Sequence, residues 1–267
     1  FIGFNEAIML NESKKEVLRK SRDTLRDDIH SYLKEKQPDE ILPKFNGQGS
    51  YMMHTIVNPI VDKDGNSEYD LDDGVYFIGE ENDKKNVTTY HNWIYSAVKG
   101  RTKEQVDKNT CVRVIYADGH HIDLPIYFII KGNCPELAHK SNGWIKSDPK
   151  EFYEWFNKKA KHNEQIRRIV RYFKAWCDKR NNDNSAVEMP SGMIMTILAA
   201  NNYSPMTGMT LRLKILCSQF ITILSRVLCV IVQQLLQMKT SLKVLVIQEK
   251  IIFSVDLIPF YFQQTNQ

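Results

Sequence analysis

The sequence predicts an α+β protein in which a long helix is followed by strand-like segments and then by further helices. Three observations support this prediction. The chain opens with a long amphipathic stretch, from about Asn5 to Lys36. Short segments with strand-like alternation follow it, and beyond residue 147 apolar residues recur with helical spacing. We therefore expect a first domain over residues 1–146 and a second over residues 147–267.

Composition is that of an ordinary soluble protein, and 267 residues are enough to bury a sizeable core. The formal net charge of +4 is modest and does not by itself indicate a polyanionic partner. Five cysteines are scattered without metal-ligand spacing, so we interpret them as reduced structural thiols. No signal peptide is visible, and we expect a cytoplasmic protein. Because the chain begins with Phe1, we expect a short N-terminal piece to precede it.

The first stretch is interpreted as one amphipathic scaffold helix that ends at Gln37-Pro38. Its apolar residues recur near helical spacing, and charged residues fill the other face. The residues expected to face inward are Val17, Leu18, Leu25, Ile29, Tyr32 and Leu33.

Acidic residues interrupt two apolar strand-like segments, at 68–77 and 121–128. Side chains of a strand alternate between its faces, so Asp70 and Asp72 point the same way while Leu71 points into the core. Asp73 points away from that pair, and we assign it a structural role. Asp123 is the carboxylate of the later strand. A carboxylate in such a segment is costly unless it is neutralised. Three that converge indicate a divalent cation, and all-oxygen ligands favour Mg²⁺ or Mn²⁺ over zinc.

A glycine-rich turn, Gly47-Gln48-Gly49-Ser50, precedes the acidic pair. Glycines let backbone amides approach a phosphate closely, and the serine hydroxyl adds a donor. No Gly-Lys-Ser/Thr follows, so this is not a Walker loop. A phosphate cradle, an Asp-x-Asp pair and a distal third aspartate together indicate two-metal nucleotidyl transfer.

The remaining segments of the first domain have simpler interpretations. Residues 62–66 are expected to form a solvated hairpin turn, and about Asn86 to Val98 a helix. The basic turn at 99–101 either is solvated or meets nucleotide phosphates, and a solvated turn is favoured. His120 and His121 are interpreted as a hairpin end, with His121 near the nucleotide.

In the second domain, Asp148-Pro149 predicts the start of a helix. A further helix from Gln165 to Lys179 has one apolar face, and its arginines 167, 168 and 171 are expected on a solvated face. Lys174 falls one residue off the apolar face, where the residues alone favour a surface lysine. Ser191 is expected to cap the next helix and to be able to contact a phosphate.

The chain resembles nucleotidyltransferases of the polymerase-β superfamily, and more closely the bacterial cGAS/DncV-like enzymes, or CD-NTases. These make cyclic oligonucleotide signals in anti-phage defence. The resemblance extends from about the first helix to Pro205. It rests on an ordered set of motifs, at 47–50, 69–77, 121–127, 172–176 and 190–193.

The resemblance implies an α+β fold with a polymerase-β-like core, in which a mixed sheet is backed by a long spine helix, and a helical C-terminal lobe. It also implies a specific set of site residues. Two Mg²⁺ or Mn²⁺ ions would lie between Asp70, Asp72 and Asp123, with Asp123 the best candidate for the base. Nucleotide-binding residues would be Gln48, Gly49, Ser50, Lys174 and Ser191. The substrates would be NTPs, without a nucleic-acid template or a membrane. A regulatory partner and a cyclic-nucleotide-activated effector are implied for such enzymes.

Three alternatives stay open beside a cyclic di- or trinucleotide synthase. One is another transferase of the superfamily, which adds nucleotides linearly or modifies a small molecule. The second is a non-catalytic binding module, and the third is a protein left inactive by a disrupted C-terminus. Three intact aspartates disfavour a purely binding protein.

The composition changes after Gly208, where Ile, Leu, Val and Gln dominate and only Glu249 and Asp256 are acidic. Arg226 and two glutamines interrupt the apolar run at 221–236, so we do not expect a membrane helix there. A shift of one base in plausible codons beyond Ser218 yields a polar peptide that resembles the usual C-terminal end of the family. We therefore treat residues 208–267 as doubtful and hypothesise a change of reading frame near 206–209.

Overall fold

A computed structural model describes residues 2–61, 67–183 and 189–203 of the chain. Its contacts divide the chain into two compact units. One is Met9–Lys161; the other combines Phe1–Ile8 with the chain from His162 onwards. This division falls after residue 161, whereas the sequence predicts the domain boundary after residue 146. The turn expected at 62–66 and the doubtful stretch 208–267, with its apolar run at 221–236, lie outside the described residues.

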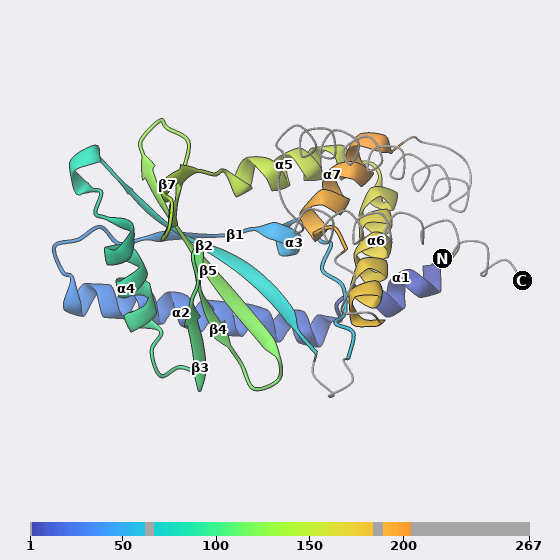
Figure 1. Ribbon diagram of the computed structural model, residues 1–267, viewed down its shortest axis with the longest axis horizontal. Coiled ribbons are helices and arrows are strands. Elements are labelled where there is room, and N and C mark those ends of the chain that lie inside the picture. The colour runs from blue at the N-terminus through green and yellow to red at the C-terminus, as the bar shows by residue number, and fades with distance from the viewer. Residues whose placement is uncertain (1, 62–66, 184–188, 204–267) are drawn as a thin grey trace, which may run out of the picture. The chain divides into compact units, whose positions relative to one another are not determined.

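The larger unit contains a seven-stranded mixed sheet with the order β1-β2-β5-β4-β3, to which β6 and β7 are added beside β5. Its central pair, β2 with β5, is parallel, and the other pairs are antiparallel. This mixed sheet with helices confirms the α+β prediction (Figure 1). The strands are β1 Lys44–Gly47, β2 Tyr69–Gly79, β3 Glu104–Asp107, β4 Cys111–Ile115, β5 His120–Ile130, β6 Glu136–His139 and β7 Gly143–Lys146.

The expected single N-terminal helix is wrong, because the structure has two helices there. α1 covers Ile2–Ile8, and α2 covers Glu12–Lys36. The Asn11 carboxamide accepts a hydrogen bond from the Lys14 amide at 2.8 Å and so starts α2 afresh. Leu18, Leu25, Ile29 and Leu33 are buried as predicted, whereas Val17 is 37% exposed.

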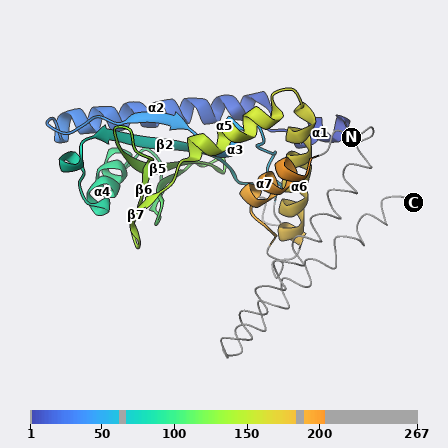
Figure 2. The same cartoon turned by 90° about the horizontal axis from the view of Figure 1, so that it is seen from above.

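The main core lies between α2, α4 (Val87–Ala97) and one face of the sheet. Figures 1 and 2 show these helices and strands in two views. Asn86 caps α4, close to the predicted start of that helix. Each fully buried apolar side chain contributes about 1.5–3 kcal/mol relative to exposure. From the two central strands the core takes Leu71, Val75, Phe77, Ile122, Leu124, Ile126 and Phe128.

An ion pair with a buried carboxylate joins α2 to the sheet. Arg26 donates Nε and Nη2 to the two oxygens of Asp73 at 2.7 and 2.5 Å, and Asp73 is fully buried. Burial opposes the charge on Arg26, but the hydrogen bond and charge of Asp73 outweigh it and raise the pKa of Arg26. Asp73 therefore faces α2, as the structural role assigned from alternation requires.

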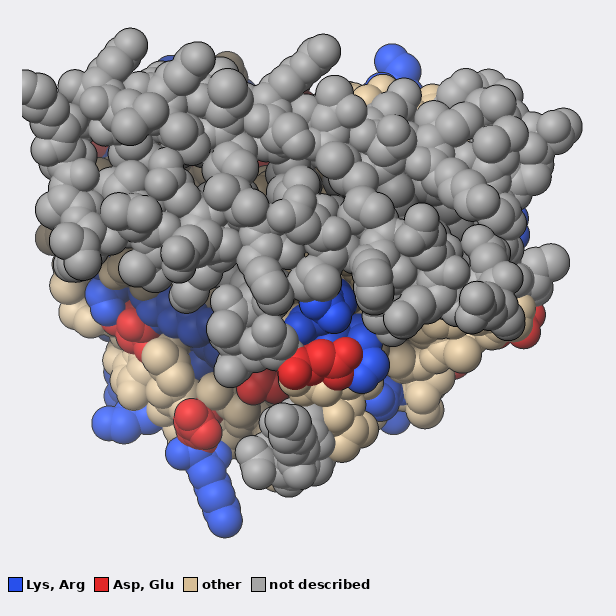
Figure 3. Space-filling model, turned by 45° about the vertical axis from the view of Figure 1, so that its right-hand side comes forward, with Lys and Arg blue, Asp and Glu red and all other residues tan. Residues whose placement is uncertain are grey.

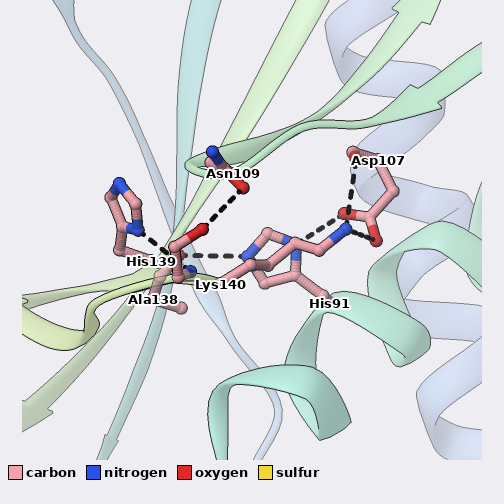
Figure 4. A network of polar contacts seen from close by, with 7 residues as sticks. His91, Asp107, Asn109, Ala138, His139 and Lys140 are labelled. Atoms are coloured by element: carbon pink, nitrogen blue, oxygen red, sulfur yellow. Dashed lines mark hydrogen bonds and ion pairs between the residues drawn. The ribbon is translucent and has the colours of Figure 1, made fainter.

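A second polar network joins α4 to the sheet edge (Figure 4). The buried His91 ring lies 2.6 Å from a carboxylate oxygen of Asp107 and 3.0 Å from the Ala138 carbonyl oxygen. Lys140 donates to the same carboxylate at 2.7 Å. These contacts hold the positions of α4, β3 and β6 relative to one another.

The described residues of the larger unit also form three other helical elements: α3 Gly49–Met52, a 3-10 helix at Glu81–Asp83, and α5 Pro149–Ala160. The Asp148 carboxylate accepts from the Glu151 amide and Pro149 is the first helical residue, as predicted. The described part of the other unit contains α1, α6 Glu164–Asp183 and α7 Gly192–Asn202.

Arg171 departs from the sequence prediction. We expected it on a solvated face of α6, but its residue exposure is 3%. Its guanidinium donates to Asn5 Oδ1 at 3.0 Å and to Glu164 at 3.1 Å, so it joins α1 to α6. Burial lowers the pKa of Arg171. Periodicity did not reveal this role because Asn5 is 166 positions away along the chain.

Within the described ranges, every helix is too short or too polar to cross a membrane. On the face in Figure 3, described Lys and Arg side chains lie next to Asp and Glu side chains. This mixture agrees with the modest net charge.

We predict that Arg26→Ala destabilises the protein by about 3 kcal/mol, because it leaves the Asp73 carboxylate buried without its arginine. Arg101→Ala is the matched control, since Arg101 makes the same two-bond contact with Asp28 but is 41% exposed. That change should cost at most about 1 kcal/mol. Urea unfolding followed by tryptophan fluorescence measures both. Equal losses would contradict a special role for the buried pair.

Candidate active site

The second face of the central strand pair brings the predicted aspartates together. In the parallel register Asp70 is opposite His121, and Asp72 is opposite Asp123. Leu71 and Asp73 lie on the other face, in the core and against Arg26. The alternation predicted for this segment is therefore confirmed, and two strands far apart in sequence present their carboxylates on one face.

The glycine turn lies directly on this acidic pair. β1 runs antiparallel to β2 with Gly47 opposite Asp73, and the Gln48 amide donates to the Asp72 carbonyl at 2.9 Å. Gly49 has φ +62°, and a Cβ there would lie 2.3 Å from the Asp72 carboxylate oxygen Oδ2. Only glycine fits this combination of backbone conformation and close approach. Ser50 follows in the first turn of α3.

Arg113 is a site residue that the sequence reasoning missed. It is opposite Asp123 in the β4–β5 hairpin and donates Nε and Nη2 to the two carboxylate oxygens at 2.6 and 2.7 Å. Burial opposes its charge, but the hydrogen bond and charge of Asp123 raise the pKa of Arg113. The signal for this pair was the turn at Asp118-Gly119, because both residues lie five positions from Asp118.

The predicted metal site is not preassembled in the part of the chain that the structure describes. No group of three or more His, Cys, Asp or Glu side chains there is arranged to hold a metal ion. Asp123 is instead neutralised by Arg113. The three carboxylates still share one face of the sheet, and their all-oxygen chemistry fits Mg²⁺ or Mn²⁺. Metal binding by Asp70, Asp72 and Asp123 stays a prediction.

His121 lies beside this acidic group, opposite Asp70, and is buried. Burial, together with the charge of Arg113, lowers the pKa of His121. A neutral imidazole is therefore the favoured form at neutral pH. Its neighbour His120 contacts Ser21 and Asp118 on the other side of the strand. Both histidines begin β5 directly after the β4–β5 turn, as the hairpin-end interpretation expects, and the position of His121 near a nucleotide stays a prediction.

Gln48 is placed differently from what a nucleotide contact suggests. Its residue exposure is 6%, and its side chain bonds to two tyrosines. Tyr76 donates to Gln48 Oε1 at 3.2 Å, and Gln48 Nε2 donates to the Tyr127 hydroxyl at 3.3 Å. The predicted contact between this side chain and a nucleotide stays a prediction, while its observed contacts are those of a support beneath the turn.

The smaller unit brings together the other two predicted nucleotide ligands. Ser191 caps α7, where its hydroxyl accepts from the Ile194 amide at 3.5 Å. A Cβ on Gly192 would lie 3.1 Å from Lys174 Cε and 3.7 Å from its Nζ. The Lys174 ammonium group, from α6, thus lies beside the N-terminus of α7. This combination of positive charge and backbone amides suits a phosphate.

Comparison with known proteins agrees with the fold and the motifs. Residues 43–127 match the family model of the nucleotidyltransferase domain of cyclic GMP-AMP synthase DncV-like proteins. The matched segment contains the glycine turn and all three aspartates. The match confirms the resemblance to DncV-like nucleotidyltransferases over this part of the chain.

The curated relatives include several cyclic GMP-AMP synthases. A cyclic GMP-AMP synthase of Escherichia albertii is 33% identical over 162 residues, covering 57% of this chain and 35% of the relative. Another, from Vibrio cholerae, is 26% identical over 205 residues and covers 52% and 44%. The matches therefore span less than half the length of these relatives.

Solved structures share the fold. Vibrio cholerae DncV, described as a cyclic AMP-GMP synthase and prokaryotic cGAS homolog, has a TM-score of 0.69 at 20% identity, covering 83% of this chain and 76% of that one. Its GTP-bound form has a TM-score of 0.68 at 20% identity, covering 81% and 74%. At this identity the likeness establishes a shared nucleotidyltransferase fold.

We predict that Gly49→Ala destabilises the protein by about 3 kcal/mol, because a methyl group adds a clash with Asp72 to the strain of positive φ. Gly100→Ala separates the two contributions, since Gly100 has φ +82° and a Cβ there would have no atom within 4 Å. It should cost only about 1 kcal/mol. Urea midpoints measure both, and equal midpoints would show that the turn does not pack on Asp72.

Proposed function

We propose that the protein is a template-independent nucleotidyltransferase that makes a cyclic di- or trinucleotide from NTPs. The observation that carries the proposal is the register of β2 with β5, which sets Asp72 opposite Asp123 beneath a glycine turn. This arrangement combines a place for a triphosphate with carboxylates for divalent cations. The family match over the same residues supports it.

In this proposal Asp70, Asp72 and Asp123 hold two Mg²⁺ or Mn²⁺ ions. When bound, the ions neutralise the triphosphate and leaving pyrophosphate and favour ionisation of the attacking hydroxyl. Asp123 is the candidate base for the proton of that hydroxyl, a role that requires it to part from Arg113. The chain's own contribution is then positioning for in-line attack on an α-phosphate.

The phosphates are assigned to two sets of residues. The Gly49 amide and the Ser50 hydroxyl would hold the β- and γ-phosphates next to the acidic face. Lys174 of α6, which lies beside Gly192, would supply a cation, and Ser191, which caps α7, would supply a further donor. His121, favoured as a neutral imidazole, lies close enough to the acidic face to meet the same nucleotide without adding charge.

The choice of product rests on the relatives. Structures of Vibrio cholerae DncV are described with GTP and with the linear intermediate 5' pppA(3',5')pG. By that likeness ATP and GTP are the first substrates to test here. A cytoplasmic anti-phage role, with a regulatory partner and an effector activated by the product, is part of the same proposal.

We predict that Asp72→Asn abolishes product formation while leaving the fold intact, because it removes a metal-binding charge at constant volume. The assay incubates the purified chain with four labelled NTPs and Mg²⁺ or Mn²⁺, followed by phosphatase and nuclease digestion. Asp27→Asn, at an exposed position of α2, is the matched control and should keep wild-type activity.

Each result of that assay has a definite meaning. A phosphatase-resistant product with internal phosphodiesters only supports the cyclase, and wild-type turnover by Asp72→Asn refutes the assignment. Phosphatase-sensitive linear products, or nucleotide attached to a second substrate, favour another transferase of the superfamily. If the wild-type chain makes nothing, repeating the assay with the C-terminal stretch in the alternative reading frame separates a disrupted tail from a missing activator.

A further inference from the structure

The site face contains a pair of tyrosines that the proposed chemistry does not use. Tyr76 and Tyr127 are opposite each other in the same parallel register that sets Asp72 opposite Asp123. Their rings are stacked, with centroids 4.6 Å apart and planes 11° apart, and their exposures are 6% and 3%. Tyr76 follows Asp72 by four positions of strand, which is about 13 Å.

Gln48 connects the tyrosine pair to the acidic pair. Its carboxamide bonds to both tyrosine hydroxyls, and its main-chain amide donates to the Asp72 carbonyl. Gln48 is thus held by the tyrosine pair through its side chain and by Asp72 through its main chain. Because Gly49 and Ser50 follow it directly, any movement of Gln48 moves the proposed phosphate donors relative to Asp72.

The hydroxyl groups of Tyr76 and Tyr127 can hold the Gln48 carboxamide in place because they stay protonated. Burial raises the pKa of Tyr127 to about 12 and shifts the pKa of Tyr76 upward as well. Both phenols are therefore neutral at physiological pH. A neutral Tyr76 keeps the proton that it donates to the Gln48 carbonyl oxygen, and a buried carboxamide with both ends bonded has one preferred orientation.

Gly74 makes room for the contact. A Cβ there would lie 2.5 Å from a Tyr76 ring carbon and 3.0 Å from Gln48 Oε1. Any larger residue would displace the tyrosine ring or the carboxamide. The glycine of the Asp-Asp-Gly-Val-Tyr segment is therefore explained by the packing of Gln48 rather than by a turn.

Helix α5 braces the same turn on both sides. Before the turn, Asn46 Nδ2 donates to the Tyr153 hydroxyl at 3.2 Å. After it, Asn157 Nδ2 donates to the Met52 carbonyl at 3.1 Å. The ends of the turn are thus held by α5, and its middle is held by Gln48.

We propose that Gln48, Tyr76 and Tyr127 are positioning residues that set where Gly49 and Ser50 lie relative to Asp72. The inference rests on the proposed function, because it treats this turn as the holder of the triphosphate. The three side chains act through the turn and do not touch the reacting atoms.

The test compares Tyr127→Phe and Gln48→Leu with Tyr90→Phe. Tyr90 is an equally buried tyrosine of the same unit, and its hydroxyl bonds to the main chain at residues 83 and 85, away from the turn. We expect kcat to fall about tenfold in Tyr127→Phe and about a hundredfold in Gln48→Leu, as misplacement of reacting groups does. Tyr90→Phe should stay within about twofold of wild type, although all three lose a buried polar contact.

The double variant Gln48→Leu with Tyr127→Phe asks whether the tyrosine acts through the glutamine. We expect it to be no slower than Gln48→Leu alone, because the first change already removes the contact. Losses that multiply would overturn the inference. So would a fall in kcat of equal size in Tyr90→Phe, since the effect would then come from general destabilisation.

A measurement without turnover keeps the inference separate from the proposed function. Hydrogen exchange in the peptide covering residues 45–53 should become at least about tenfold faster in Tyr127→Phe and Gln48→Leu, and stay unchanged in Tyr90→Phe. If the wild-type chain makes no product from NTPs but this difference appears, the proposed function fails while the placement of the turn by Gln48 stands. Exchange that is unchanged in all three variants overturns the inference.

Discussion

The parallel pairing of β2 with β5 is the constraint on which the other features depend. In this register Asp72 meets Asp123 and Tyr76 meets Tyr127, so one face carries both an acidic end and an aromatic end. A slip of one residue would exchange the two faces of β2 and bury the acidic pair. Such a slip is disfavoured because the other face of β2 inserts Leu71, Val75 and Phe77 into the main core.

Neighbouring aspartates on one strand illustrate how position decides the role of a carboxylate. Asp72 faces the glycine turn, whereas Asp73 faces α2 and is neutralised there by Arg26. The two residues have the same chemistry and opposite environments. The ion pair joins α2 to β2 at Asp73, the residue next to Asp72. It therefore supports β2 on the face opposite the candidate site.

Sequence reasoning reached features that depend on local periodicity. Alternation along the strand separated Asp72 from Asp73, and the fold class followed from the order of helical and strand-like segments. Features set by pairing across the fold were missed. The contact of Arg113 with Asp123 depends on hairpin register, and the burial of Gln48 depends on two tyrosines from different strands. The break before α2 was missed because a cap at Asn11 leaves the charged and apolar pattern nearly unchanged.

The contact between Arg113 and Asp123 has a consequence for how a cation would be admitted. Both oxygens of the carboxylate are already bonded to the guanidinium, so a cation and the arginine compete for one ligand. The apparent affinity for the cation is then the intrinsic affinity multiplied by the fraction of molecules in which the ion pair is open. The charge of Asp123 is balanced whether the arginine or a metal ion holds it. The arginine thus acts as a built-in counter-ion, which lowers the repulsion among the three carboxylates of this face.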